Sequence, residues 1–141
     1  MDRTLNWKLR GFITFVAWAC LAAIALGTLS ELNLIYRLYY LLAPFLNYPS
    51  MRTYATMEHL AAYAIVGILF SAVYPRSAPL VCIFLILFIA VLEAMQTFIP
   101  DRHGTLRDAA EKILGGVAGV VLMTLALRWR KSRRIESVEP S

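Results

Sequence analysis

Three short pairs of polar residues stand inside or at the start of long hydrophobic runs, where polar side chains are costly. The pairs are His59 with Tyr63, Glu93 with Gln96, and Asp108 with Lys112. Spacings of three and four residues place both members of a pair on one face of a helix. An imidazole, carboxylates and an amine gathered in one place are able to move protons, bind phosphate or form buried ion pairs.

The composition indicates which elements must hold these residues. The chain has 141 residues, of which 60% are hydrophobic and 16% are charged, and its mean hydropathy is +0.63. Soluble domains are closer to half apolar and a quarter charged. The sequence therefore predicts an integral membrane protein with one compact helical domain.

Four apolar runs are each close to the ~20 residues that a helix needs to span a bilayer. They are Gly11–Leu29, Met57–Tyr74, Ala78–Ile99 and Ala109–Leu127. Between the first two runs, residues 30–56 contain LNLIYRLYYLLAPF, which is rich in Leu and Tyr but too short to span, so it is expected to lie in the interface. The predicted fold is all-α, an integral membrane bundle of four transmembrane helices with a short interfacial segment between the first and second.

The basic residues predict an orientation. With both termini in the cytoplasm, nine of the 14 Lys and Arg residues lie on that side, including the dense group after Leu127. The predicted regions are a cytoplasmic N-terminus at 1–10, a transmembrane domain at 11–127 and a basic cytoplasmic tail at 128–141, which is expected to be disordered. A basic start before an apolar run also fits a signal peptide, but this run is longer than a usual signal core, which favours an uncleaved helix. The expected location is the cell membrane, as a multi-pass protein.

On this topology, the three polar pairs fall at a similar depth near the outer leaflet, on three separate helices. Glu93 lies about two turns, or ~10 Å, below Pro100, which ends its run. A charged residue at such a depth is paired, protonated or functional. We therefore expect a shared polar pocket, with Arg102 and Arg107 at its rim to engage phosphate.

Each polar residue also has a purely structural explanation. Glu93 is placed to meet Arg102, Lys112 or His59, and a structural ion pair with Lys112 or Arg102 ranks only slightly below a ligand or catalytic role. His59 would start its helix at headgroup level. Asp108 would cap the following helix, because Thr105 stands three residues before it in a capping-box pattern.

Small residues in the apolar runs are expected to be structural as well. Gly115 and Gly119 have the GxxxG spacing, which favours close helix packing within the protomer. Cys20 and Cys82 stand inside apolar runs without CxxC or metal spacing, so they are expected to be small buried hydrophobes. No cofactor or metal is predicted, and no nucleic acid partner, because the positive-inside rule explains the basic ends.

Several of these residues carry a resemblance to a known family. HLAAY at 59–63 resembles the HFxxY element of the VanZ-like family of small polytopic membrane proteins. The family's second block is similar to Glu93 with Gln96, Pro100 with Arg102, and Asp108. The resemblance covers roughly residues 52–125.

The sequence departs from the family pattern at two places. In the family's DxxxNxxGxxxG continuation, Lys112 stands where Asn is typical, which would turn a hydrogen-bonded site into an ion-paired one. Ala55 and Thr56 occupy the places of an Asp-Lys pair. The resemblance implies a small helical protein of the bacterial inner membrane and cell envelope. The family is named for a member associated with teicoplanin resistance, but its biochemical activity is not established, and resistance is not transferred to this chain.

The leading hypothesis is an outward-facing pocket that binds a lipid headgroup or a lipid-linked envelope precursor. Its predicted residues are His59, Tyr63, Glu93, Gln96, Arg102, Asp108 and Lys112. One alternative is a membrane enzyme acting on a lipid-linked substrate with His59 as general base. Another is a structural accessory subunit of an envelope complex, with a membrane protein as partner. Binding ranks above catalysis because the sequence has no GxSxG, HExxH or DDxxD-type motif.

Overall fold

The computed structural model describes residues 3–29, 41, 51–98 and 105–136. These residues form four long helices and contain no strand. The helices are α1 (Arg3–Leu29), α3 (Met51–Val73), α4 (Ala78–Gln96) and α5 (Leu106–Glu136). Each contains a stretch that is long and apolar enough to cross a membrane, so the predicted all-α transmembrane bundle is confirmed. The predicted interfacial segment lies outside the described residues.

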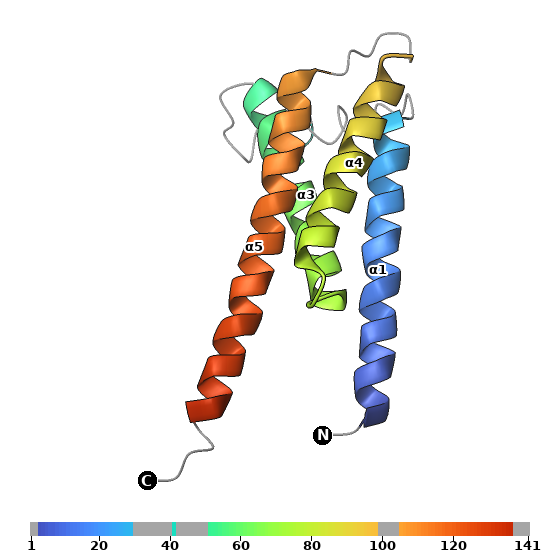
Figure 1. Ribbon diagram of the computed structural model, residues 1–141. Coiled ribbons are helices and arrows are strands. Elements are labelled where there is room, and N and C mark those ends of the chain that lie inside the picture. Colours follow the sequence, from blue (N-terminus) through green and yellow to red (C-terminus); the bar gives the residue numbers. More distant parts are fainter. Residues whose placement is uncertain (1–2, 30–40, 42–50, 99–104, 137–141) are drawn as a thin grey trace.

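The four helices alternate in direction along the chain (Figure 1). We call the end where α1 and α4 finish and α3 and α5 begin the site end, and the opposite end the basic end. The first turn of α1 and the last turn of α5 both lie at the basic end (Figure 1). There the guanidinium of Arg10 on α1 donates to the carbonyl oxygen of Val73 at the end of α3, at 3.1 Å. A cation suits this helix terminus, where carbonyl groups lack partners within the helix.

Several helix boundaries differ from the predicted runs, and two of these differences change the interpretation of predicted residues. α3 begins at Met51 rather than Met57, so His59 lies about 12 Å inside the helix at 1.5 Å per residue and does not start it. α5 continues to Glu136, so the expectation of disorder in the basic tail is wrong for residues 128–136. Lys and Arg are good helix formers, and cations near a helix C-terminus interact favourably with its dipole.

The distribution of apolar side chains fits a bundle surrounded by lipid. Large hydrophobic residues such as Phe15 (71% exposed) and Leu80 (66% exposed) face outward, where acyl chains would cover them. Between the helices lies a buried hydrophobic core that includes Ala17, Leu21, Val66, Phe70, Val81, Leu85 and Val120. Cys20 and Cys82 are both free and pack against this core, in keeping with small apolar roles.

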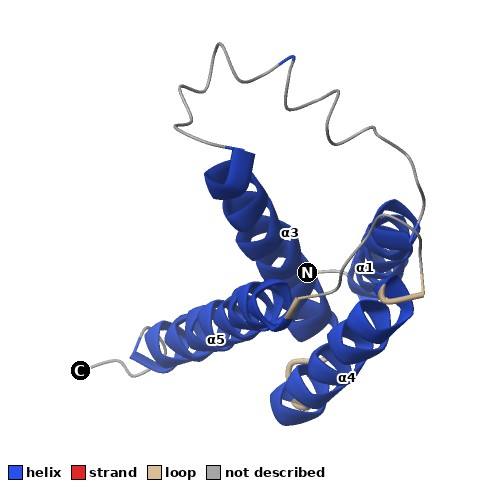
Figure 2. Ribbon diagram, turned by 90° about the horizontal axis from the view of Figure 1, so that it is seen from above, coloured by secondary structure: helices blue, strands red, loops and turns tan. Residues whose placement is uncertain are grey.

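The closest contact in the molecule is between α3 and α5, which run side by side in the same direction (Figures 1 and 2). A Cβ atom added to Gly115 would overlap the carbonyl oxygen of Leu60, and one added to Gly119 would overlap that of Ala64. Gly67 of α3 stands equally close to the Gly116 carbonyl of α5. In a membrane, small residues drive association by letting backbones approach. The contacts of Gly115 and Gly119 join two helices of the same chain, as their GxxxG spacing predicts.

This contact predicts a stability effect for Gly119→Ala. The new methyl group would meet the backbone of Ala64, which cannot move aside as a flexible side chain would. We expect a loss of about 1–3 kcal/mol, the usual cost of overpacking, measured as a lower midpoint of unfolding of the purified protein in detergent. Gly27→Ala is the matched control, because no atom of a neighbouring helix lies within 4 Å of its Cβ position. Equal midpoints for the two variants would contradict the close contact.

Candidate functional site

The site end holds a buried ion pair between α4 and α5. The ammonium Nζ of Lys112 binds Oε1 of Glu93, and the two side chains are only 4% and 11% exposed. The other oxygen of Glu93, Oε2, is buried without a hydrogen-bond partner among the described residues. Removing both charges from solvent is costly, and each depends on the other to remain there. The primary role of the Glu93–Lys112 pair is therefore structural, because it holds α4 and α5 together.

Three further residues surround this pair and bring in the other two helices. Gln96, one turn beyond Glu93 on α4, donates from Nε2 to the backbone carbonyl of Thr28 on α1, at 3.3 Å. Tyr63 of α3 is 2% exposed, and its hydroxyl lies close to the Thr28 side chain and within electrostatic reach of Glu93. We call Thr28, Tyr63, Glu93, Gln96 and Lys112 the buried layer. All four helices contribute to it.

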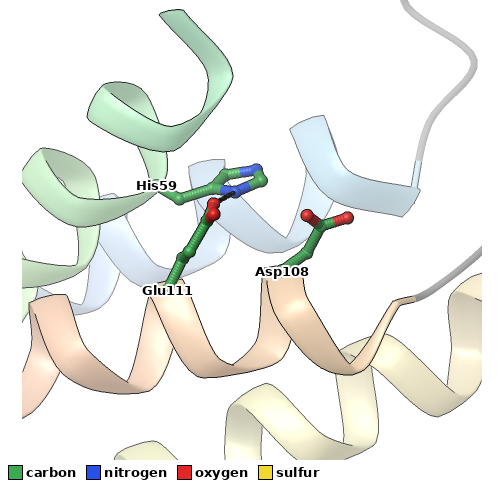
Figure 3. A group of neighbouring side chains, drawn as sticks. All are labelled: His59, Asp108 and Glu111. Carbon is green, nitrogen blue, oxygen red and sulfur yellow. Dashed lines mark ion pairs between the residues drawn. The ribbon is translucent and has the colours of Figure 1, made fainter. Parts of the chain in front are cut away.

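A second polar group lies between α3 and α5, closer to the start of α5. It is centred on Glu111, whose Oε1 accepts from Nε of Arg107 at 2.9 Å and from the hydroxyl of Thr56 at 3.1 Å. The other oxygen, Oε2, faces Nδ1 of His59 at 3.5 Å (Figure 3). The Glu111 side chain is 13% exposed and that of His59 is 25% exposed. Glu111 therefore links the two helices through both of its oxygens.

Asp108 completes this second group. It stands three residues before Glu111 on α5, and Figure 3 shows its carboxylate beside His59 and Glu111. Its backbone N–H donates to the hydroxyl of Thr105 at 3.1 Å, so Thr105 is the capping residue of the predicted capping-box pattern and Asp108 is the residue that it caps. Within the described ranges, no cation pairs with the Asp108 carboxylate. We call Thr56, His59, Arg107, Asp108 and Glu111 the His59 cluster.

The cluster is able to hold a metal ion by the types and positions of its donors. One donor atom from each of His59, Asp108 and Glu111 lies within 4.8 Å of the other two. The same arrangement would let Glu111 orient the imidazole of His59 for proton transfer. No metal is predicted from the sequence, and the spacing of these three donors along the chain does not form a recognisable metal motif, because they come from two helices.

The structure divides the predicted pocket into the two groups. Tyr63, Glu93, Gln96 and Lys112 belong to the buried layer, where the alternative of a structural Glu93–Lys112 ion pair is what the structure shows. His59 and Asp108 belong to the His59 cluster. Arg102 lies outside the described residues.

Sequence reasoning missed Glu111, although it is the centre of the cluster. Glu111 follows Arg107 by four residues and precedes Gly115 by four. It therefore shares a face with the glycine motif, which is the face of α5 that packs on α3. That periodicity would have identified it, together with Thr56, which stands three residues before His59 on α3.

The basic end has a different character. A cavity of about 360 Å³ lies there, between the turn after α3 and the second half of α5. It is lined by Pro75, Arg76, Ala78, Pro79, Thr124, Leu127, Arg128 and Lys131. The three cations in this lining set the basic end apart from the site end, where carboxylates predominate.

The comparisons with known proteins supply no relative for this chain. No protein-family model matches it, and no curated protein or solved structure matches it. The function must therefore be argued from the site itself.

The buried layer predicts that Lys112→Met is strongly destabilising. This change leaves the Glu93 carboxylate buried without its cation, which typically costs about 3–5 kcal/mol. The double variant Glu93→Leu with Lys112→Met should recover most of that loss, because no unpaired charge remains. Unfolding of the purified protein in detergent measures both effects.

The control is Arg107→Gln, which breaks the more exposed pair with Glu111. The Arg107 side chain is 56% exposed, and exposed pairs contribute about 0.2–1 kcal/mol. A cost for Lys112→Met no larger than that of Arg107→Gln would show that the Glu93–Lys112 pair is not a constraint on the fold.

Proposed function

We propose that this chain is a VanZ-like protein of the cell envelope that binds a lipid headgroup or a lipid-linked envelope precursor at its site end. The observation that carries the proposal is the depth and exposure of the His59 cluster. It lies in the first turns of the stretches Ala55–Val73 and Leu106–Arg133, which are long and apolar enough to cross a membrane, and these turns would stand at the level of lipid headgroups. It also combines hydrogen-bond donors with acceptors in a bundle whose outer surface is otherwise largely apolar.

The side chains suggest how a headgroup is held. Arg107 is more than half exposed and presents a guanidinium, which matches the geometry of phosphate oxygens. It now binds Glu111, and a phosphate would compete for it. Thr56 and His59 offer further polar atoms, and Asp108 is placed to accept from a headgroup hydroxyl. Arg102, from the segment before α5, is proposed to join Arg107.

The buried layer has a supporting role in this proposal. Lys112 is already bound to Glu93 and is 3% exposed, so it is not available to a ligand at the surface. The pair instead connects α4 to α5 directly beneath the cluster. We therefore assign ligand contact to the His59 cluster and positioning to Tyr63, Glu93, Gln96 and Lys112.

The proposed location is the cell membrane, with both termini in the cytoplasm. The start of α1 and the end of α5 share one end of the bundle, and the lining of the cavity at that end includes Arg76, Arg128 and Lys131. Cytoplasmic ends of membrane proteins are enriched in such residues. The site end would then face the outer side of the membrane.

Catalysis is a second candidate, favoured by the contact between His59 and Glu111. A carboxylate 3.5 Å from Nδ1 of an imidazole is able to orient it as a general base. The substrate would be a lipid-linked molecule at the same position. Turnover of such a lipid by the purified protein, abolished in His59→Ala without loss of lipid binding, would establish an enzyme rather than a binding protein.

Lipid binding predicts a specific effect of Arg107→Gln. Native mass spectrometry of the protein with polyprenyl phosphate, compared with the phosphate-free polyprenol, measures the preference. We expect the variant to lose roughly 10- to 100-fold of its affinity for the phosphorylated lipid, because a charge-assisted hydrogen bond contributes about 1.5–3 kcal/mol.

Arg130→Gln is the matched control, since Arg130 is an exposed arginine on the same helix at the basic end. It removes the same charge and should leave the preference unchanged. An equal loss in both variants would indicate nonspecific attraction to anionic lipid and would remove the support for a site at Arg107.

The orientation has its own test. A fluorescent protein fused after the last residue should fluoresce, whereas alkaline phosphatase at the same position should be inactive, because that enzyme needs an oxidising compartment for its disulfides. The opposite pattern would place the site end on the cytoplasmic side.

A further inference from the structure

We propose that His59, Asp108 and Glu111 form a binding site for a divalent transition-metal ion, Zn²⁺ or Mn²⁺. The ligands would be Nδ1 of His59 and one carboxylate oxygen from each acidic residue (Figure 3). Metal binding by these protein atoms does not depend on the proposed lipid ligand. It adds a component to the cluster that the functional proposal lacks.

The spacing of the donor atoms fits a shared ion better than a direct contact. Nδ1 of His59 and Oε2 of Glu111 are 3.5 Å apart, which is long for a hydrogen bond. Two ligands that are each about 2.1 Å from a tetrahedral ion lie roughly 3.4 Å apart. The third donor, from Asp108, is within 4.8 Å of both, so rotation of one half-buried carboxylate would complete the set.

His59 itself has an unused coordinating atom. Nδ1 is buried from solvent, and its contact with Oε2 of Glu111, at 3.5 Å, is too long for a good hydrogen bond. A buried polar atom without a partner is costly, and coordination to a metal is one way to satisfy it. Neutral imidazole is among the commonest metal ligands in proteins.

Glu111 is oriented as a coordinating carboxylate would be. Its Oε1 is held by Arg107 and Thr56, and Oε2 is left facing His59. Hydrogen bonds to the oxygen that does not bind the ion are the usual means by which metal sites fix their carboxylates. The rigid α3–α5 contact one turn away also fixes the distance between the two helices that carry the ligands.

The charge of the cluster favours a cation. Asp108 and Glu111 contribute two carboxylates, and Arg107 is the one described cation that pairs with either. Glu58 of α3 adds a further carboxyl group within electrostatic reach of His59. A divalent ion would offset this excess of negative charge.

The ligand types indicate the class of ion. One imidazole with two carboxylates suits Zn²⁺ or Mn²⁺, whereas Mg²⁺ and Ca²⁺ prefer oxygen ligands throughout. Three protein ligands leave a coordination position open. If the proposed function is correct, a headgroup phosphate oxygen would occupy that position, and this last step rests on the proposed function.

The test uses the full chain, stripped with a chelator and returned to detergent without metal. Mn²⁺ is added alone, and its binding is followed by electron paramagnetic resonance. We expect one ion per chain and a nitrogen coupling from a single histidine. Mn²⁺ is chosen because it binds thiols weakly, so the free Cys20 and Cys82 do not interfere.

The chain offers matched controls, because it has two histidines, His59 and His103. His59→Asn should abolish the nitrogen coupling and weaken Mn²⁺ binding by at least about tenfold, whereas His103→Asn should preserve both. Glu111→Gln should weaken binding similarly, and Glu58→Gln should do so by less than threefold. Absence of stoichiometric binding, or a nitrogen coupling that survives in His59→Asn, would overturn the proposal. The coupling in the unmodified protein is informative even if a variant fails to fold.

A second arm separates this proposal from the lipid proposal. Binding of polyprenyl phosphate is measured with Mn²⁺ and with chelator. Metal binding with tighter lipid binding in Mn²⁺ supports both proposals. Metal binding with no lipid preference under either condition leaves the metal site standing and removes the lipid role. A preference for the phosphorylated lipid without any metal binding would support the lipid proposal and overturn the metal site.

Discussion

The close approach of α3 and α5 is the constraint on which the rest of the structure depends. Lipid provides no hydrophobic force to bring helices together, so the contact relies on backbone surfaces that fit. Gly115 and Gly119 remove the side chains that would separate α5 from Leu60 and Ala64. Because Glu111 stands one turn before Gly115 and His59 directly precedes Leu60, the same fit brings His59 to Glu111. Packing and chemistry therefore share one interface.

The polar residues form two layers with different tasks. In the buried layer, Lys112 and Glu93 neutralise one another and join α5 to α4. In the His59 cluster, Glu111 is only partly satisfied by Arg107, and the Asp108 carboxylate has no cation among the described residues. A charge in hydrocarbon is costly unless it is paired, so Glu93 and Lys112 must stay bound to each other and are not available to a ligand. The shallower cluster retains donors and acceptors that a ligand is able to use.

The arrangement favours binding over catalysis as the first function to test. The described part of the cluster contains acid–base groups but no cysteine, and its one hydroxyl, on Thr56, already donates to Glu111. A bound metal would make catalysis more favourable, because an ion with an open coordination position is able to bind a phosphate oxygen or to activate a water molecule. The nature of the chemistry at the site end therefore depends on whether His59, Asp108 and Glu111 take up an ion. Membership of the VanZ-like family is likewise a proposal, because none of the comparisons with known proteins supplies a relative.

The sequence by itself determined the membrane-spanning helices, the polar pairs inside them and the capping-box pattern at the start of α5. These features follow from hydrophobicity and from interactions within a few residues of the chain. Only the tertiary structure decided that Lys112 pairs with Glu93, and that Glu111 rather than Glu93 meets His59. Periodicity states which face of a helix a residue occupies, but not which neighbour that face meets. The direction and closeness of the α3–α5 contact supplied that missing relation.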